Sequence, residues 1–303
     1  MWNLRIDASI GEVVVALRAR NIDSMTLKGP TFNDWYPPDS GRTYIDGDVW
    51  VSPNDVPVAE QALAALGFVP TADERGLPEW WQEHASSWLR EHDQGKIDLH
   101  RRLQGAEAEP RLVWSTLWAG RDPILIGGVS VWRLSEPGRA LYATLHATHH
   151  GSEDARGLPH LEAALAAVDD SGWRAALELA RQLDAVEAFA TGLRLLPAGT
   201  ELAARIDVPD ARSVKTALLA STPPPVALGF DQLHGARGLR RMEILLRKVF
   251  PPPGFICHWW PPAGRNRGML VLGYLYRPIW LVKNAPAGYR AWRAARRKAS
   301  SSS

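Results

Sequence analysis

Two aspartates one residue apart, followed at once by an apolar run, constrain the fold of this chain more than any other segment. Asp46 and Asp48 precede Val49-Trp50-Val51, and residues 42–51 alternate in the manner of a β-strand. Side chains two apart on a strand point the same way, so both carboxylates project from one face of a sheet. Carboxylates this close repel each other unless a cation neutralises them. The segment predicts a sheet with a cation-binding acidic pair, although such a pair taken alone is also common on solvated strand faces.

The segments around the acidic pair predict a small α/β unit with a mixed sheet. Apolar spacing over residues 8–20, with Ser9 as the N-cap, predicts a helix. Lys28-Gly29-Pro30 ends a strand over 24–27 and opens a helix to about Tyr36, because proline suits a first helical turn. The other elements expected here are a helix from Asp55 to about Leu66, strands over 86–90 and 96–103 joined by a turn at His92-Asp93-Gln94-Gly95, and an apolar hairpin over 123–134.

The second half is expected to be mostly α-helical, which makes the whole chain α+β. Helices are expected at 136–150, 158–168, 171–182, 184–194, 199–205, 211–220 and 237–249. Proline groups at 223–225, 251–253 and 261–262 predict irregular connections in the last third, where residues 269–282 are expected to be buried core. The expected division is an α/β domain over 1–134, a helical domain over 135–298 and a disordered tail over 299–303.

Composition and charge limit the partners and the cellular compartment expected of the protein. The 303 residues are 46% hydrophobic and 22% charged, and a formal net charge of +2 does not by itself support a nucleic-acid partner. The one cysteine, Cys257, excludes an intramolecular disulfide framework and predicts a reducing, cytoplasmic setting. The chain begins without a signal-peptide pattern, and no apolar run approaches the ~20 residues that cross a bilayer, so no membrane partner is expected.

A third carboxylate completes the acidic set if its strand lies beside the first. It is Asp98, in Lys96-Ile97-Asp98-Leu99-His100. Three carboxylates suffice for two Mg²⁺ ions about 4 Å apart, the arrangement that supports in-line displacement at phosphorus. In this scheme Asp46 and Asp48 ligate both ions, one of which holds a triphosphate. Asp98 ligates the second ion and accepts the proton of the attacking hydroxyl, so all three are candidate catalytic and metal-binding residues.

Upstream, the Lys28-Gly29 turn is expected to bind phosphate. Glycine lets backbone N–H groups approach phosphate closely, the following helix presents its N-terminus, and Lys28 adds a point charge. Arg42, just before the strand, is a candidate clamp for a phosphate oxygen or a base. The ordered set of turn, arginine and three carboxylates favours a nucleotide site over a solvated strand face.

The same residues resemble a known family. The segments Leu27-Lys28-Gly29, Trp35-Tyr36-Pro37, Arg42, Asp46-Gly47-Asp48-Val49-Trp50-Val51, Ala64-Ala65-Leu66-Gly67-Phe68 and Ile97-Asp98-Leu99-His100 are similar to the pattern of the uncharacterised nucleotidyltransferase family of the DNA polymerase beta superfamily. The stretch 145–151 is similar to the histidine-bearing helix of that family. The remaining helical half resembles members from actinobacterial gene clusters for ribosomally made peptides, including lasso peptides.

The resemblance implies a polymerase-beta-like nucleotidyltransferase fold. It also implies transfer of a nucleoside monophosphate from ATP or another triphosphate to an acceptor, with Mg²⁺ as the expected metal and Mn²⁺ as a substitute. Two positions depart from the family pattern. Gly47 stands for the usual bulky apolar residue, which removes a packing anchor behind the aspartates, and Trp50 stands for a typical leucine.

Histidines near these elements are candidate substrate residues. His146, His149 and His150 fall at i, i+3 and i+4 on the expected helix. This spacing suits a zinc site, a contact with substrate or nucleotide at a domain interface, or packing near Gly151. His100 shares the strand face of Asp98, where it orients that carboxylate, touches the acceptor or has a structural role.

Basic residues line two expected helices of the last third. They are Arg237, Arg240, Arg241, Arg247 and Lys248 on one, and Arg290, Arg293, Arg296, Arg297 and Lys298 on the other. They predict either solvated faces or a groove for an acidic or phosphorylated substrate. Trp259 and Trp260, followed by Arg265 and Arg267, predict either a peptide- or base-stacking surface or packing between the two halves.

Two functions follow from these features. The first is an Mg²⁺-dependent nucleotidyltransferase whose helical, acceptor-binding domain selects a peptide hydroxyl or phosphate, a small molecule or, less favoured, nucleic acid. The alternative is an accessory protein that holds a nucleotide or a precursor peptide without turnover. All three carboxylates are present, which favours the enzyme, because a decayed site tends to lose at least one.

Overall fold

A mixed sheet organises the first half of the chain. The computed structural model describes residues 2–37, 40–71, 84–151, 157–210, 213–221, 224 and 226–300. Among these residues seven strands pair in the order β3-β4-β5-β2-β1-β7-β6: β1 (Ser24–Thr26), β2 (Gly47–Val51), β3 (Val69–Pro70), β4 (Ala85–Arg90), β5 (Gly95–His100), β6 (Asp122–Ile126) and β7 (Val129–Arg133). β2 runs parallel to β5 and β1 runs parallel to β7, whereas the other neighbours are antiparallel. The α+β class with a mixed sheet is as predicted.

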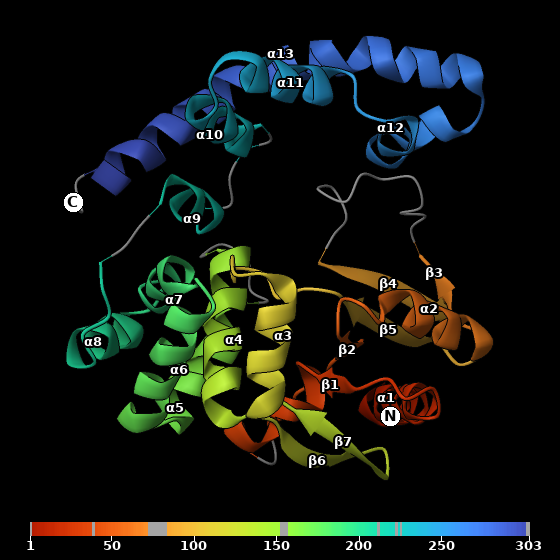
Figure 1. Ribbon diagram of the computed structural model, residues 1–303, viewed down its shortest axis with the longest axis vertical. Coiled ribbons are helices and arrows are strands. Elements are labelled where there is room, and N and C mark those ends of the chain that lie inside the picture. The colour runs from red at the N-terminus through yellow and green to blue at the C-terminus, as the bar shows by residue number, and fades with distance from the viewer. Residues whose placement is uncertain are drawn as a thin grey trace.

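Helices cover both faces of this sheet (Figure 1). α1 (Trp2–Arg18) and α2 (Val56–Ala65) lie on one face, where Ile10 packs in a buried cluster with Val49 and Val51. Trp50 points to the other face and packs edge-on against Trp114, with 4.9 Å between ring centroids. Because side chains alternate along a strand, the even-numbered residues of β2 face the helical half of the molecule.

α4 (Glu136–His150) is the centre of that helical half. It packs against α5 (Leu158–Ala167), α6 (Asp170–Gln182) and α7 (Val186–Leu193), with α3 (Pro110–Ala119) and α8 (Pro197–Arg205) at the sides. Ser135 Oγ accepts the N–H of Gly138 at the start of α4, and Gly151, at φ 73°, ends it. The largest buried cluster joins Met25 and Trp50 of the sheet to residues of α4, α6 and α7. Sheet and helices therefore share one core across position 134, and the predicted division into domains there stays a prediction.

The described residues from 213 to 300 form a further set of helices, here called the C-terminal layer (Figure 1). It contains α9 (Val214–Leu219), α10 (Ala227–Gly235), α11 (Gly238–Val249), α12 (Pro253–Trp259), the 3₁₀ turn η3 (Pro261–Gly264) and the long α13 (Arg267–Ser300). α9 connects the layer to the rest through contacts with α4 and α7. The buried clusters of the layer are small, one around Phe255 and Ile256 and one around Leu218 and Trp292. Within the described parts of the chain, no helix combines the length and the apolar character needed to span a membrane.

The prediction for the last third was wrong in its main element. α13 continues through Pro278 and Pro286, and much of the stretch 269–282 is exposed rather than buried core. Packing on one side of the helix outweighs the proline signals, because Arg277 is buried and its guanidinium lies 4.5 Å from the centre of the Trp259 ring. Pro223, Pro225 and residues 301–303, which the sequence assigned to a connection and a tail, lie outside the described residues.

Smaller departures have local causes. The helices α3, α10 and α12 were not predicted. Ser9, expected to cap a helix, lies inside α1, which already begins at Trp2. Residues 42–46 are not strand, because Asn3 Nδ2 donates to the Arg42 carbonyl and Tyr44 donates its hydroxyl to Asp7, which hold this segment against α1.

Candidate active site

Asp48 and Asp98 are direct neighbours across two parallel strands. The register of β2 and β5 places Asp48 opposite Asp98 and Trp50 opposite His100. Residues paired in this way point to the same face of the sheet, which is the face toward α4. The prediction that the strand of Asp98 lies beside that of Asp48 is confirmed by this register.

Asp48 forms a buried ion pair. Its Oδ1 accepts a hydrogen bond from Lys28 Nζ at 2.8 Å and lies 2.7 Å from His100 Nε2, while the residue is 2% exposed. Burial alone would raise the pKa of Asp48, but the charge of Lys28 and the contact with His100 hold it well below its usual range. Burial alone would lower the pKa of Lys28, but Asp48 holds it above its usual range. Asp48 and Lys28 therefore both stay charged at neutral pH.

Asp98 has the opposite electrostatic character. Ser87 of β4 donates its hydroxyl to Asp98 Oδ1 at 2.6 Å. Burial, followed by the negative charge of Asp48, raises the pKa of Asp98 above its ordinary value. A carboxylate with a raised pKa is the better proton acceptor near neutral pH. Two adjacent carboxylates with opposite pKa shifts thus suit different roles, Asp48 as a permanent charge and Asp98 as a base.

Asp46 lies just before β2 and is turned toward Lys96. The Lys96 Nζ and Asp46 Oδ2 atoms are 3.1 Å apart. Among the residues that the structure describes, no group of three or more His, Cys, Asp or Glu side chains is arranged to hold a metal ion. The donor types still suit Mg²⁺, since three carboxylates provide only oxygen ligands. The structure therefore brings two of the three predicted ligands together, and the metal roles of Asp46, Asp48 and Asp98 stay predictions.

The Lys28-Gly29 turn is built tightly. Gly29 has φ 60°, a left-handed conformation that favours glycine, although a Cβ there would make only ordinary contact with the Tyr44 ring at 3.4 Å. Arg42 Nη1 donates to the Gly29 carbonyl at 2.7 Å and to Asn33 Oδ1 at 2.8 Å. Arg42, expected to clamp a phosphate or a base, thus braces the turn and η1 (Gly29–Trp35) in this structure. The binding roles of Lys28, Gly29 and Arg42 remain predictions.

Two side chains of α4 are within the electrostatic influence of Lys28 and Asp48. Tyr142 is buried, and burial raises the pKa of its hydroxyl, which the charge of Lys28 opposes and that of Asp48 reinforces. One turn later, His146 Nδ1 is buried without a hydrogen-bond partner in the described structure. Burial and then the charge of Lys28 hold the pKa of His146 well below its ordinary value, so the ring is neutral. A buried ring nitrogen without a partner, close to a candidate phosphate turn, is suited to contact substrate.

A line of histidine rings leads from the carboxylates to a cavity. His84 lies between His100 and His149, with ring centroids 5.3 Å and 6.0 Å away, and Gln104 Nε2 is 3.1 Å from His149 Nε2. The His150 ring lies 4.4 Å from that of His146. His84, Gln104 and His149 line a cavity of about 630 Å³ that extends to α7 and α9. This volume suits a small molecule or a short peptide segment.

The sequence of residues 1–198 matches a family described as uncharacterised nucleotidyltransferase. The chain belongs to this family. Comparison with functionally curated proteins finds no similar sequence. Among solved structures, that of the antibiotic-resistance factor ANT(2'')-Ia aligns with 13% identity and a TM-score of 0.42 over 60% of this chain and 94% of that one. A nucleotidyltransferase-like protein from Paracoccidioides brasiliensis aligns with 14% identity and a TM-score of 0.39 over 68% of this chain and 93% of that one.

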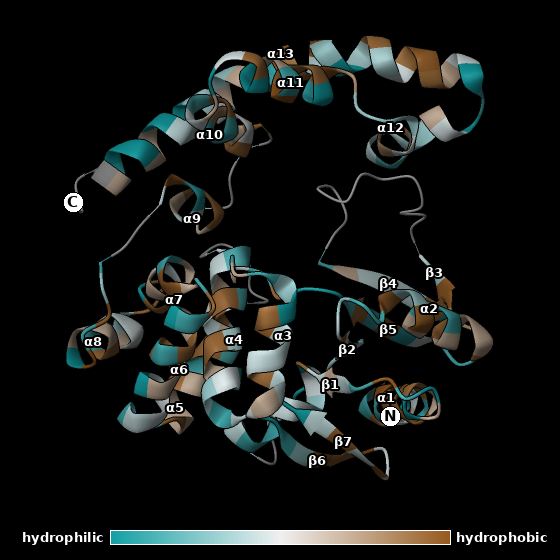
Figure 2. Cartoon of the chain, in the orientation of Figure 1, coloured by the Kyte–Doolittle hydropathy of each residue, from teal (hydrophilic) through white to brown (hydrophobic). Residues whose placement is uncertain are grey.

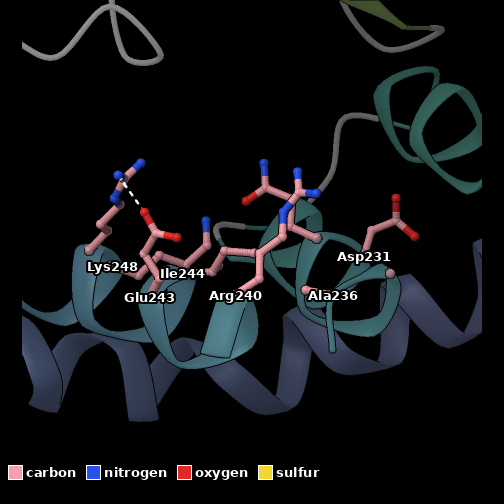
Figure 3. Close-up of a pocket in the computed structure, with 9 residues that line it drawn as sticks. Asp231, Ala236, Arg240, Glu243, Ile244 and Lys248 are labelled. Carbon is pink, nitrogen blue, oxygen red and sulfur yellow. Dashed lines mark ion pairs between the residues drawn. The ribbon is translucent and has the colours of Figure 1, made fainter. Parts of the chain in front are cut away.

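Membership of the nucleotidyltransferase family was predicted from the sequence and is confirmed. The family match ends near the start of α8, so the C-terminal layer lies beyond it. In that layer a pocket of about 660 Å³ lies between α10 and α11 (Figure 3). Arg240, Arg247 and Lys248, which the sequence placed in a groove or on a solvated face, line it together with Asp231 and Glu243.

Several site residues of this family member were missed by sequence reasoning. Ser87 could have been found from the predicted hairpin, whose turn lies at 91–94 rather than 92–95 and whose register pairs Ser87 with Asp98. Lys96 could have been found because it lies two residues before Asp98 on the same strand face. Tyr142 could have been found because it lies one helical turn before His146. His84 gave no local signal, since only the fold brings its ring to His100.

Proposed function

We propose that this member of the family is an Mg²⁺-dependent nucleotidyltransferase that moves a nucleoside monophosphate from ATP or another triphosphate to a hydroxyl or phosphate of a peptide or small molecule. Tailoring of a ribosomally made peptide in the cytoplasm is one setting that fits this activity. Within the helical half, residues of α4, α7 and α9 would select the acceptor. The cavity of about 630 Å³ beside His84 and His149 is the proposed place for it.

The observation that carries the proposal is the pairing of Asp48 with Asp98 on one face of β2 and β5. Carboxylates so placed and so different in pKa provide a fixed negative charge and a proton acceptor side by side. A nucleotidyl transfer reaction needs both, because a metal triphosphate must be held while the acceptor loses a proton.

Each residue has a defined task in the proposed reaction. Bound Mg²⁺ supplies charge neutralisation at the phosphate oxygens. Asp46, Asp48 and Asp98 would hold the metal, and Lys28 with the Gly29 turn would hold the phosphates. The acceptor oxygen forms a bond to the α-phosphorus, the bond from that phosphorus to pyrophosphate breaks, and the acceptor proton passes to Asp98. Tyr142 and His146 would position the substrates from α4.

The test uses ATP labelled at the α-phosphate, with Mg²⁺ and candidate peptides or cell extract. Label transfer is expected, and Asp46→Asn or Asp48→Asn should reduce it at least about a hundredfold, because each removes charge stabilisation from the transition state. Asp23→Asn, at an exposed aspartate next to β1, is the matched control and should leave transfer unchanged. Transfer of the γ-phosphate alone would contradict the proposal.

The ion pair between Lys28 and Asp48 also supports the alternative function. The Lys28 ammonium neutralises the charge of Asp48, and such a paired site also suits an accessory protein that binds a nucleotide or precursor peptide without turnover. Such a protein would bind labelled ATP but transfer no label to any acceptor, whereas the enzyme would transfer it in the presence of Mg²⁺.

A further inference from the structure

The charge of this chain is strongly divided along its length. Residues 211–303 contain 16 Lys and Arg but 2 Asp and Glu, whereas residues 1–210 contain 19 Lys and Arg and 31 Asp and Glu. The net charge of +2 is therefore the sum of an acidic part, residues 1–210, here called the body, and a basic C-terminal layer. A basic region of this density attracts an anionic partner and is repelled by a cationic one.

The basic layer also holds most of the exposed apolar side chains. Of the 19 exposed large hydrophobic residues in the described structure, 12 lie between Leu239 and Tyr289. Single exposed apolar residues are ordinary on protein surfaces, but a concentration of them on adjacent helices marks an interaction site.

α11 is two-sided, and its apolar side is uncovered. The helix has no buried residue, and Leu239, Met242 and Leu246 are exposed at i, i+3 and i+7, with Leu239 90% exposed. Its polar side, represented by Arg240 and Lys248, lines the pocket between α10 and α11 (Figure 3). Ile244 also lines the pocket, but Leu239, Met242 and Leu246 do not, so these three form a separate face toward solvent.

α13 repeats the same arrangement on a larger scale. Val271, Leu275 and Val282 share one side of the helix at i, i+4 and i+11, and all are exposed, Val282 by 74%. The opposite side is the packed one: a Cβ added to Gly273 would lie 2.7 Å from Ile256 of α12. Figure 2 shows hydrophobic residues along the first part of α13 and hydrophilic residues toward its C-terminal end.

Cations continue the exposed side of α13. From Val282, steps of three or four residues lead to Arg290, Arg293 and Arg297. Tyr276 and Tyr289 do not belong to this exposed side, because the Tyr276 ring stacks on Trp259 and the Tyr289 ring packs against Phe230. One side of this long helix thus presents apolar side chains and then arginines to the same surroundings.

We propose that the C-terminal layer docks on an anionic phospholipid bilayer surface through the apolar sides of α11 and α13. Exposed apolar stripes beside arginines match the side chains by which helices lie in a membrane interface. A nucleic acid would use the arginines but leave the leucines and valines in water. The inference does not depend on nucleotidyl transfer, since no candidate active-site residue belongs to these two helices.

This inference departs from the expectation of no membrane partner. That expectation rested on the lack of an apolar run long enough to cross a bilayer. A helix that lies on a membrane needs an apolar side and nearby cations but no spanning length. The apolar side of α13 does not stand out in the sequence, because Arg277, Pro278 and Lys283 interrupt its apolar residues.

The test is co-sedimentation of the full chain with lipid vesicles. Vesicles of phosphatidylcholine containing about one-third phosphatidylglycerol should bind the protein, and vesicles of phosphatidylcholine alone should bind it at least about tenfold more weakly. Raising the salt concentration should weaken binding to the anionic vesicles, because exposed charges are screened. Recovery of the wild-type chain in the supernatant with anionic vesicles would overturn the proposal.

Paired variants distinguish vesicle binding through the proposed surface from nonspecific adsorption of the protein to lipid. Leu239→Gln with Leu246→Gln should lower vesicle affinity about tenfold or more, because two exposed apolar side chains lose their burial in lipid. Leu125→Gln, at a 72% exposed leucine of β6, is the matched control and should bind as wild type does. Equal binding by the α11 variant, or an α11 variant that instead converts a dimer to a monomer in light scattering, would overturn the lipid assignment. Label transfer to a dissolved acceptor should be the same in both variants, so failure of one proposal is distinct from failure of the other.

Discussion

Gly47, between Asp46 and Asp48, occupies a position where the fold leaves no room for a side chain. The sequence suggested that glycine removes a packing anchor there. In the structure the space is already filled, because a Cβ added to Gly47 would lie 2.5 Å from Ile10 Cγ1 and 3.1 Å from Ile97 Cδ1. Ile10 of α1 therefore fills the space that a side chain at position 47 would occupy. The close approach of that helix fixes the backbone between Asp46 and Asp48.

Gly47→Ala is expected to lower the free energy of unfolding by about 1–3 kcal/mol, because the added methyl group overpacks the contact with Ile10. Urea unfolding measures this directly. The double variant with Ile10→Ala should be less unstable than the sum of the two single variants, since each change makes room for the other. Strict additivity of the two free-energy changes would show that Ile10 does not set the constraint.

Other site residues differ in how far the sequence reveals them. Asp48 and Asp98 follow from strand alternation together with the order of elements. The contact of Lys28 with Asp48 does not, because it depends on how the turn after β1 folds back over β2. His84 is hidden for the same reason, as its ring meets His100 only through the β4–β5 pairing.

At the scale of elements, local sequence signals predicted a helix correctly where tertiary packing favours the same bounds. α4 begins and ends where predicted, because Ser135 caps it and Gly151 stops it. α13 shows the opposite case, since its packing against α12 keeps helical a stretch that contains Pro278 and Pro286. Sequence signals for breaking a helix are overridden when one side of it is held by tertiary contacts.

The docking of α5 on η1 should make stability depend on pH. His160 of α5 has its Nδ1 2.9 Å from the Tyr36 hydroxyl, and burial, followed by the positive charge of Arg42, lowers its pKa to about 4. An unfolded histidine has a pKa of about 6.5, so between these values the unfolded chain binds a proton that the folded chain does not. The free energy of unfolding should therefore fall by up to about 3 kcal/mol on this account as pH drops from about 6.5 to about 4.

His160→Gln removes this contribution, so the pH dependence of unfolding by urea should be flatter in the variant than in the wild type over that interval. His92→Gln, at a histidine whose side chain is 73% exposed, should keep the wild-type slope. Identical slopes in the wild type and His160→Gln would mean that His160 is not held neutral by the fold.

At the scale of the whole molecule, stability is divided unevenly. One buried cluster ties the sheet to the helices around α4, whereas the C-terminal layer relies on two small clusters and shares none of its buried cluster residues with the body. The layer also lies outside the part of the chain that defines the family. A body with a large core and a layer with small ones should open separately, the layer at the lower free energy.

Hydrogen exchange of the full chain measures that difference. Backbone amides of α11 and of the first half of α13 should exchange at least about tenfold faster than those of α4, because local opening of the layer exposes them without unfolding the shared core. Anionic vesicles should slow exchange in the layer and leave α4 unchanged, since a ligand stabilises only the element that it binds. Equal protection of α4 and α13 without vesicles would show instead that the layer and the body open as one cooperative unit, with α9 as the coupling element between them.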